Sequence, residues 1–302
     1  MIELLELDLT KAKKEIRKIK AKRILLQLPD GLKDKTTEII KELNSTGAEV
    51  IALMDPCFGA CDANPQLLKE FNADLLIHLG HLQIQENKKI LFIPLKYGIE
   101  KGKIKKLSEL LEKELNKKKI NSIALCTTAQ YLDWVPELKK ELKKIKVFTS
   151  KGTGRIKAEA QVLGCNFSAL KEPSKKAEAI VFLGDGLFHP LGASYANELP
   201  FYALNPIEEK IKEISSEKEK FLRKSFARIA KAEEAESFGI VISKKQGQKF
   251  LNKAIKLKKL IEGKGKKAFL FAVDYVNESY FLGTKIDCFV ITACPRIVFD
   301  DA

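Results

Sequence analysis

The fold of this chain is decided by residues 23–54, RILLQLPDGLKDKTTEIIKELNSTGAEVIALM. This stretch begins and ends with short apolar runs, Arg23–Leu28 and Glu49–Met54, which are typical of buried strands. Between the runs, Pro29-Asp30-Gly31 opens a segment whose apolar residues recur at helical spacing across Leu32–Leu43. A strand, a turn, a helix and a second strand form the unit of an open parallel sheet covered by helices. The sequence therefore predicts an α/β protein.

The same kind of element order recurs along the rest of the chain. Further strands are predicted at Asp74–Leu79, Leu91–Leu95, Ser122–Cys126, Lys146–Thr149, Ala179–Leu183, Phe201–Leu204, Gly239–Ser243, Ala268–Ala272 and Cys288–Thr292. Further helices are predicted at Ile104–Leu115, Pro206–Glu236 and Phe250–Ile261. Each repeat covers about 100 residues, the size of a small domain. We therefore expect three similar domains, each a parallel sheet flanked by helices, at residues 1–100, 101–205 and 206–302.

The chain is strongly basic, with a formal net charge of +14. Such a charge favours an acidic partner, and nucleic acid is the first candidate. However, only six of the 54 basic residues are arginine, the residue whose planar fork reads guanine edges and phosphates. A lysine-rich, solvated surface is the simpler interpretation, and we expect no sequence-specific nucleic-acid binding.

The sequence also bears on location. No stretch reaches the roughly 18 consecutive apolar residues that a membrane helix needs. The first residues, MIELLELDLTKAKKEIRKIK, are typical of an amphipathic helix and lack the basic start and cleavage site of a signal peptide. We therefore expect a cytoplasmic protein without membrane contact. Thiols stay reduced in the cytoplasm, so six cysteines there need a reason other than disulfides.

The six cysteines fall into two groups by predicted position. Cys126 ends one predicted strand and Cys288 begins another, both among apolar neighbours, so both are most simply explained as core residues. The other four lie in loops that follow strands: Cys57, Cys61, Cys165 and Cys294.

Loop thiols from three predicted domains could surround a single cofactor. Ligands of open parallel sheets bind at the carboxyl ends of the strands, and Cys61, Cys165 and Cys294 are separated by about one domain each. Three thiolates would leave one iron of a 4Fe–4S cluster open for a substrate. Zinc with three thiolates and a water is an alternative, and so are purely structural cysteines, because scattered single cysteines do not decide between them.

Either Cys57 or Cys61 could supply the ligand from the first domain. Gly59 and Ala60 directly before Cys61 would let the backbone approach a bulky inorganic group, which favours Cys61.

Several other residues could line a binding site. Asp30-Gly31 and Gly184-Asp185-Gly186 follow strands and could hold a nucleoside or amino-acid group, although each could be an ordinary turn. His78 lies within a strand and is expected to be structural, whereas His189 lies in a loop and could line a site. Arg296 could grip a substrate carboxylate or cap a sheet. The sequence contains neither G-x-G-x-x-G nor a Walker loop, which disfavours NAD and ATP.

Six motifs are spread over nearly the whole chain. They are Gln27–Leu32 (QLPDGL), Phe58–Asp62 (FGACD), Leu163–Cys165 (LGC), Leu183–Gly192 (LGDGLFHPLG), Phe238–Gln248 (FGIVISKKQGQ) and Thr292–Arg296 (TACPR). Together and in this order, they resemble the archaeal diphthamide synthase family, whose 2-(3-amino-3-carboxypropyl)histidine synthase carries out the first step of diphthamide biosynthesis.

The resemblance implies a non-conventional radical enzyme. Three α/β domains would surround a central 4Fe–4S cluster and give it one cysteine each, Cys61, Cys165 and Cys294. The fourth iron would bind S-adenosylmethionine, and the reduced cluster would break the bond from sulfur to the methionine γ-carbon. The 3-amino-3-carboxypropyl radical would then add to C2 of a histidine imidazole in elongation factor 2. A homodimer and a reducing electron donor are also implied.

Cofactor contacts are assigned to eight residues in or beside these motifs: Asp30, Gly31, Gly184, Asp185, Gly186, His189, Gln248 and Arg296. Family chains are expected to continue past Asp301 with another strand, whereas this sequence ends at Ala302. The residues alone also allow a metal-containing nucleic-acid or tRNA-modifying enzyme, or a non-catalytic α/β binding protein with buried thiols. Metal analysis would distinguish the three classes. Iron with sulfide indicates the radical enzyme, zinc indicates most versions of the nucleic-acid enzyme, and neither metal indicates the binding protein.

Overall fold

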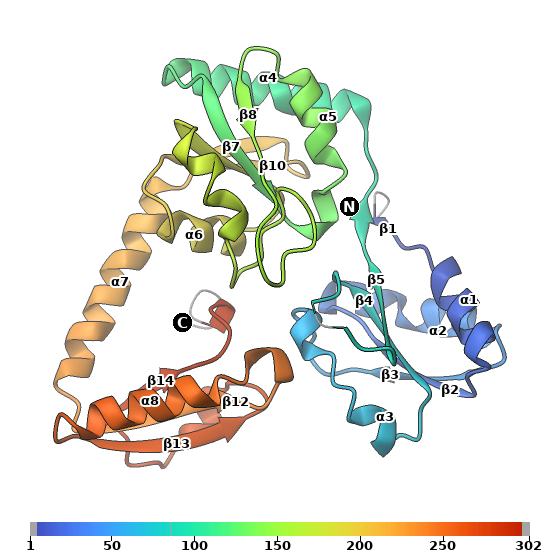
Figure 1. Ribbon diagram of the computed structural model, residues 1–302, viewed down its shortest axis with the longest axis vertical. Helices are drawn as coiled ribbons and strands as arrows, with labels where there is room; N and C mark the ends of the chain where they lie inside the picture. Colours follow the sequence, from blue (N-terminus) through green and yellow to red (C-terminus); the bar gives the residue numbers. More distant parts are fainter. Residues whose placement is uncertain (1–4, 85, 298–302) are drawn as a thin grey trace. The chain divides into compact units, whose positions relative to one another are not determined.

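The computed structural model describes residues 5–84 and 86–297 (Figure 1). The chain divides into two compact units, Met1–Ile214 and Ser215–Ala302. The first unit contains two parallel sheets and a two-stranded antiparallel pair, β1 (Leu5–Glu6) with β6 (Lys96–Tyr97). The second unit contains one parallel sheet. The α/β class predicted from the sequence is confirmed.

The first sheet has four parallel strands in the order β3-β2-β4-β5. Its strands are β2 (Arg23–Gln27), β3 (Glu49–Leu53), β4 (Leu75–Gly80) and β5 (Ile90–Pro94). Its helices and 3-10 turns are α1 (Thr10–Ile19), η1 (Asp30–Lys35), α2 (Thr36–Asn44), η2 (Ala60–Asp62) and α3 (Leu67–Glu70). Alternate residues of β2 point to opposite faces, so that Ile24 packs in the cluster of α1 and α2 and Leu25 in the cluster of α3. Both faces are therefore buried, as is usual for a parallel sheet.

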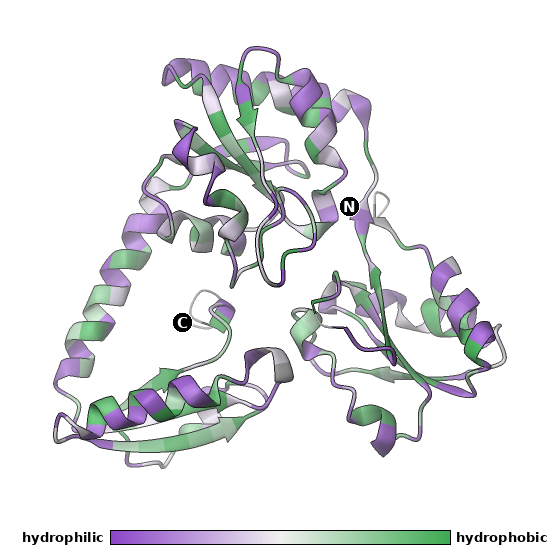
Figure 2. Ribbon diagram, in the orientation of Figure 1, coloured by the Kyte–Doolittle hydropathy of each residue, from purple (hydrophilic) through white to green (hydrophobic). Residues whose placement is uncertain are grey.

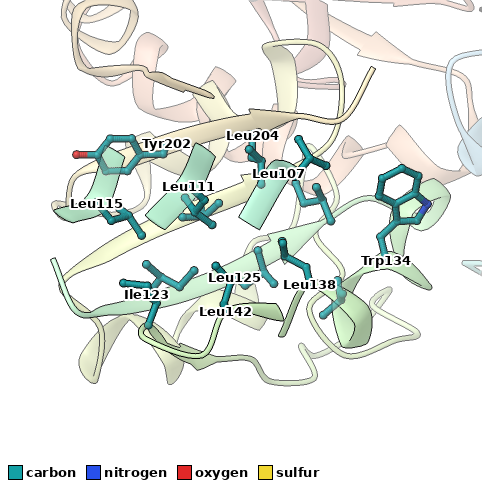
Figure 3. Close-up of a cluster of buried hydrophobic side chains, with 14 of the residues drawn as sticks. Leu107, Leu111, Leu115, Ile123, Leu125, Trp134, Leu138, Leu142, Tyr202 and Leu204 are labelled. Atoms are coloured by element: carbon teal, nitrogen blue, oxygen red, sulfur yellow. The ribbon is translucent and has the colours of Figure 1, made fainter. Parts of the chain in front are cut away.

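The second sheet has five strands in the order β11-β10-β9-β7-β8, all parallel except the edge strand β11. Its elements are α4 (Lys101–Lys117), β7 (Ser122–Thr127), η3 (Ala129–Tyr131), α5 (Trp134–Glu141), β8 (Lys146–Phe148), β9 (Ala179–Leu183), α6 (Phe188–Tyr195), β10 (Phe201–Asn205) and β11 (Lys210–Glu213). Helices α4 and α5 cover one face and α6 the other (Figure 1). Figure 3 shows Leu107, Leu111 and Leu115 of α4 in a row above the strands, one helical turn apart.

The second unit contains a sheet of three parallel strands in the order β13-β12-β14. Its elements are α7 (Ser215–Glu233), β12 (Ser237–Ser243), η6 (Gln246–Gln248), α8 (Leu251–Glu262), β13 (Lys267–Val273), η7 (Glu278–Phe281) and β14 (Cys288–Ile291). Helix α8 packs Ala254 against Ile240 and Ile242 of the central strand. Figure 2 shows that the strands are mostly hydrophobic, whereas the helices mix hydrophilic and hydrophobic residues.

All three parallel sheets share one arrangement. The first strand in the chain is flanked by the second on one side and by the third on the other. In each sheet an acidic residue directly before the third strand accepts hydrogen bonds from two main-chain N–H groups at the start of the first strand. We call these acidic residues the strand clamps; they are Asp74, Glu178 and Asp287.

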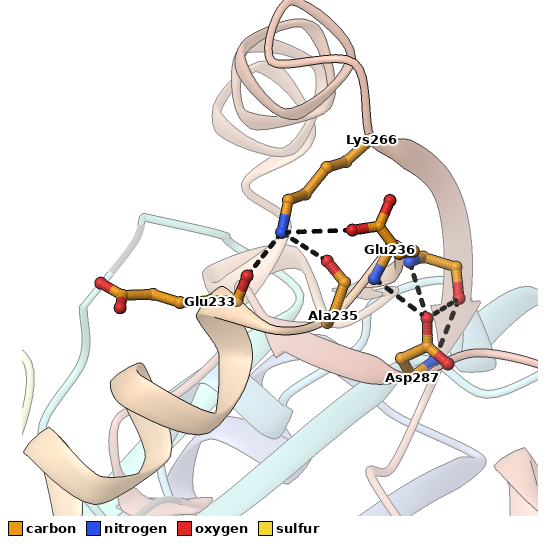
Figure 4. Close-up of polar contacts among 6 residues, drawn as sticks. Glu233, Ala235, Glu236, Lys266 and Asp287 are labelled. Atoms are coloured by element: carbon orange, nitrogen blue, oxygen red, sulfur yellow. Dashed lines mark hydrogen bonds and ion pairs between the residues drawn. The ribbon is translucent and has the colours of Figure 1, made fainter.

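The clamp of the second unit is drawn in Figure 4. Oδ2 of Asp287 accepts from N of Glu236 at 3.1 Å and from N of Ser237 at 2.9 Å. The hydroxyl of Ser237 donates to the same oxygen at 2.8 Å. Nearby, Nζ of Lys266 donates to the main-chain oxygens of Glu233 and Ala235 at 2.6 Å each, which fixes the end of α7.

The predicted strands lie within two residues of the observed ones, but one predicted helix was placed wrongly. The helix expected from about Pro206 begins at Ser215. Residues Lys210–Glu213 instead pair with β10 in antiparallel fashion, because their alternating side chains suit an edge strand. The helix predicted after Pro29-Asp30-Gly31 is present, but its first turn is the 3-10 segment η1.

Candidate metal centre

The turn that carries Cys61 follows the second strand of the first sheet and is held by its neighbour Asp62. Oδ2 of Asp62 accepts hydrogen bonds from N of Phe58 at 2.7 Å and from N of Gly59 at 2.9 Å. Nε2 of the buried Gln27 donates to the main-chain oxygen of Asp62 at 3.2 Å. Cys61 itself is partly exposed. A methyl group at Gly59 would lie 3.5 Å from Sγ of Cys61, so glycine keeps this side of the sulfur open.

The turn that carries Cys165 lies between the second and third strands of the second sheet. Leu163 and Asn166 exchange main-chain hydrogen bonds of 3.0 and 2.9 Å across it. A Cβ atom at Gly164 would lie 2.1 Å from Cζ of Phe188, so only glycine fits beside this ring. Cys165 is exposed at the tip of the turn.

Cys294 lies just past β14 in the second unit. The main-chain N–H and the hydroxyl of Thr292 both donate to the oxygen of Val241, at 2.9 and 3.0 Å. N of Ile297 donates to the oxygen of Cys294 at 3.2 Å, which closes a turn that also contains the partly buried Arg296. Cys294 is partly exposed.

Two of the remaining three cysteines, Cys57 and Cys126, are buried. Cys57 is 2% exposed, and Cys126 is fully buried within β7. Burial raises the pKa of the Cys126 thiol and, to a smaller extent, that of Cys288, where the charge of Asp287 adds to the effect. A thiolate is the form that binds metal, so the apolar core around Cys126 disfavours it as a ligand. The core position predicted for Cys126 is confirmed, whereas Cys288 is only partly buried.

The chemistry of the donor set fits an iron–sulfur cluster. Each parallel sheet supplies one partly or fully exposed thiol on a turn that follows one of its strands: Cys61, Cys165 and Cys294. Thiolates are the usual ligands of such clusters. The sequence prediction of these three ligands stays a prediction.

The Gly184-Asp185-Gly186 turn follows β9 and faces two tyrosines that the sequence did not reveal. Gly186 has φ of +72°, a conformation that side chains rarely adopt, which explains the glycine. Burial raises the pKa of both Tyr97 and Tyr131, and the charge of Asp185 raises both further. The two rings stack with centroids 4.7 Å apart. A polar group beside Asp185 would therefore meet a carboxylate and two phenol groups.

The other predicted cofactor contacts lie on several elements. Asp30 and Gly31 begin η1, where Asp30 forms an ion pair with Lys33 at 2.6 Å. His189 was expected in a loop but lies in the first turn of α6, and its ring stacks on Phe182 with the planes only 5° apart. Gln248 lies at the end of η6 and is 9% exposed. Both Gln248 and Arg296 belong to the second unit. The assignment of these residues to the cofactor stays a prediction.

Comparison with known proteins identifies the family. The sequence model of the diphthamide synthesis proteins matches residues 28–302. This chain belongs to the diphthamide synthesis family. Within that family, the 2-(3-amino-3-carboxypropyl)histidine synthase of Pyrococcus horikoshii is 34% identical over 95% of this chain and 83% of its own length. The synthase of Methanocaldococcus jannaschii is 29% identical over 92% of this chain and 79% of its own length.

Solved structures of the diphthamide synthesis family share the fold. The crystal structure of Dph2 from Pyrococcus horikoshii has a TM-score of 0.88 and 33% identity, and the match covers 97% of this chain and 85% of that one. A second crystal structure of the same Dph2, matching equally well, contains a 4Fe–4S cluster. The family resemblance predicted from the sequence motifs is confirmed.

Among residues 5–84 and 86–297, none of the helices combines the length and the apolar character that crossing a bilayer requires.

Proposed function

We propose that this protein is a 2-(3-amino-3-carboxypropyl)histidine synthase that holds a 4Fe–4S cluster through Cys61, Cys165 and Cys294. The observation that carries the proposal is the position and exposure of the cysteines. One accessible thiol lies on a turn after a strand of each parallel sheet, while Cys57 and Cys126 are buried. Cys61, Cys165 and Cys294 also lie in the sequence motifs that resemble those of the diphthamide synthesis family, whose model matches residues 28–302.

The proposed substrates are S-adenosylmethionine and a histidine of elongation factor 2. When bound, a reduced cluster supplies the electron that cleaves the bond between sulfur and the methionine γ-carbon, which releases methylthioadenosine. The 3-amino-3-carboxypropyl radical would form a bond to C2 of the imidazole, and the ring would regain its aromaticity by losing the C2 hydrogen as a proton and returning one electron to the cluster. The electron for the cleavage comes from an external reducing donor.

The protein's own residues bind and orient the cofactor in this proposal. Arg296 offers a guanidinium to the methionine carboxylate, and its planar fork suits a bidentate contact. The exposed Asp185, beside Tyr97 and Tyr131, offers a carboxylate to an amino or hydroxyl group. His189 and Gln248 complete the proposed contacts. Exclusion of water from the site would protect a radical from quenching.

The proposed assembly is a cytoplasmic homodimer that docks its protein substrate through charge. The net charge of +14 suits an acidic partner surface, and charges at the rim of an interface mainly raise the association rate. Association with elongation factor 2 should therefore slow markedly as salt is raised. Tight, sequence-selective binding of duplex DNA or tRNA at physiological salt would contradict this part of the proposal.

The experiment that tests the proposal is metal and sulfide analysis of anaerobically purified protein. We expect iron and acid-labile sulfide in equal amounts, with an absorption spectrum that dithionite bleaches. Loss of the iron and sulfide should follow replacement of any of the three cysteines by alanine. Protein that binds zinc at these three cysteines and no iron would instead indicate the metal-containing nucleic-acid enzyme.

A further inference from the structure

A second group of metal-ligating side chains lies at the carboxyl end of the first sheet. Its members are Cys57, His78 and His81, and their ligand atoms all lie within 4.8 Å of one another. Cys57 follows β3, His78 lies in β4, and His81 follows β4. Cys57 is 2% exposed and His78 is fully buried, so the group faces the interior of the first unit.

The protonation of His78 follows from its neighbour Gln27 on the intervening strand β2. Nε2 of Gln27 donates to the oxygen of Asp62, which leaves Oε1 of Gln27 facing Nδ1 of His78 at 2.8 Å. An amide oxygen only accepts hydrogen bonds, so Nδ1 of His78 carries the proton. Nε2 of His78 therefore presents a lone pair to the group.

His81 lies directly against His78. Nδ1 of His81 lies 2.9 Å from Nε2 of His78, and the two ring centroids are 5.1 Å apart. Because Nε2 of His78 carries no proton, Nδ1 of His81 donates the proton that the two rings share.

We propose that Cys57, His78 and His81 bind a divalent transition-metal ion of the zinc class, at a site separate from Cys61, Cys165 and Cys294. One thiolate and two imidazoles are a ligand set that zinc accepts, with a fourth position left for water. The hydrogen bond from His78 to Gln27 is the kind of outer contact that orients a metal-bound histidine.

Metal binding would replace the hydrogen bond between His78 and His81. A metal ion between Nε2 of His78 and Nδ1 of His81 takes the place of the shared proton. The proton of His81 then sits on Nε2. Zinc–nitrogen bonds of about 2.0–2.1 Å in a tetrahedron separate two nitrogens by roughly 3.3 Å, a few tenths of an ångström more than the present 2.9 Å. Cys57 loses its thiol proton to solvent.

Such a site would fix the turn that carries Cys61. The metal would tie Cys57, four residues before Cys61, to strand β4 two strands away. The same turn is already held by Asp62 and Gln27, so the metal would add a link between the first sheet and the cluster ligand. Without a metal, Gln27, His78 and His81 form a hydrogen-bond chain that stabilises this end of the first sheet.

The experiment uses the full chain carrying Cys61→Ala, Cys165→Ala and Cys294→Ala, prepared anaerobically without an affinity tag. Titration with Co²⁺ should saturate at one ion per chain, with the absorption of thiolate-ligated tetrahedral cobalt, and Zn²⁺ should displace it. Zinc should also raise the melting temperature, because it binds only the folded state. Adding Cys57→Ser should abolish the thiolate–cobalt band, and Gln27→Leu should weaken zinc binding by roughly 10–100-fold.

Cys288→Ser, which replaces a partly buried cysteine of the second unit, is the matched control and should leave cobalt binding unchanged. In the wild-type protein, native mass spectrometry should find one zinc in addition to the cluster. That measurement does not depend on any variant being folded. A wild-type chain and a triple variant that both bind no stoichiometric zinc or cobalt would overturn the proposal. So would a cobalt band that survives Cys57→Ser and His81→Asn.

Discussion

The first and third parallel sheets share the same frame, meaning the same order of their first three strands, but they carry their partly exposed cysteines on different loops. Both set the first strand between the second and the third, and both use a strand clamp, Asp74 in one and Asp287 in the other. In the first sheet Cys61 follows the second strand, whereas in the third sheet Cys294 follows the third strand. The repeated frame therefore does not fix which loop carries the thiol. Loops change more easily than the packed strands that support them.

The two sheets also differ in how much of each strand is buried. The edge strand β3 of the first sheet exposes only Glu49, whereas the edge strand β13 of the third sheet leaves Phe269 47% and Leu270 40% exposed. The third sheet has only three strands, so only β12 has a neighbour on both sides. Its core cluster of buried hydrophobic residues is correspondingly small. The frame therefore tolerates large differences in core size.

The largest effect is expected at the cysteines. Replacing Cys61, Cys165 or Cys294 by alanine should remove the cluster and lower activity by more than the roughly 10–100-fold that loss of an outer contact costs. Cys57→Ala should keep most of the iron, because Cys57 is buried beside the histidines rather than exposed on the turn. Iron and sulfide assays on the four variants provide the check. A requirement for Cys57 together with a dispensable Cys61 would reverse our assignment.

A smaller effect is expected at the glycines beside two of these cysteines. Gly164→Ala forces a methyl group into the ring of Phe188 and should cost about 1–3 kcal/mol of stability in the first unit. Gly59→Ala adds a methyl group at ordinary contact distance from Cys61 and should change stability little. Denaturant unfolding of the cluster-free proteins measures the difference. Equal losses for the two variants would mean that the two turns are equally tight.

The smallest effect is expected at the strand clamps. Asp74→Ala removes two main-chain hydrogen bonds at an exposed position and should cost about 1 kcal/mol. Main-chain hydrogen bonds from Arg23 and Lys22 lower the pKa of Asp74, and hydrogen bonds with Ser237 and Glu236 lower the pKa of Asp287.

The pH dependence of the clamps follows from the direction of those shifts. A carboxyl group whose pKa is lower in the folded state stabilises the fold above its unfolded pKa. That stability is lost as the pH falls below about 4, toward the folded pKa. Unfolding at pH 6 and pH 3 should therefore show a smaller difference between wild type and Asp74→Ala at the lower pH. An Asp74→Ala deficit that is unchanged at pH 3 would show that the charge of the clamp is irrelevant.

The sequence predicted the strands well because their apolar runs report burial directly. It failed at Lys210–Glu213, where charged residues form an edge strand, and it did not reveal the strand clamps, since a single acid before a strand has no distinctive pattern. The pairing of Asp185 with Tyr97 and Tyr131 also went unseen. That contact joins residues far apart in the chain and depends on how β9 packs beside η3 and β6.

The accessible cysteines were predictable for a physical reason. Loops after parallel strands meet at one edge of a sheet, so Cys61 could be placed there from the order of elements alone. The cluster of Cys57, His78 and His81 was not predictable in the same way. Strand β2 lies between β3 and β4, and only the three-dimensional register brings Gln27 opposite His78 and the thiol toward the rings.

The most direct test of the proposed chemistry is the nucleoside product formed from S-adenosylmethionine. The anaerobic, cluster-loaded protein is incubated with dithionite and S-adenosylmethionine, with and without elongation factor 2, and the products are separated by chromatography. Alignment of the reacting atoms decides which carbon–sulfur bond breaks, and well-oriented sites gain about 7–11 kcal/mol from such positioning. We predict methylthioadenosine as the main product, together with a modified histidine when elongation factor 2 is present. 5′-Deoxyadenosine as the main product would contradict the account, even if the cluster itself were confirmed.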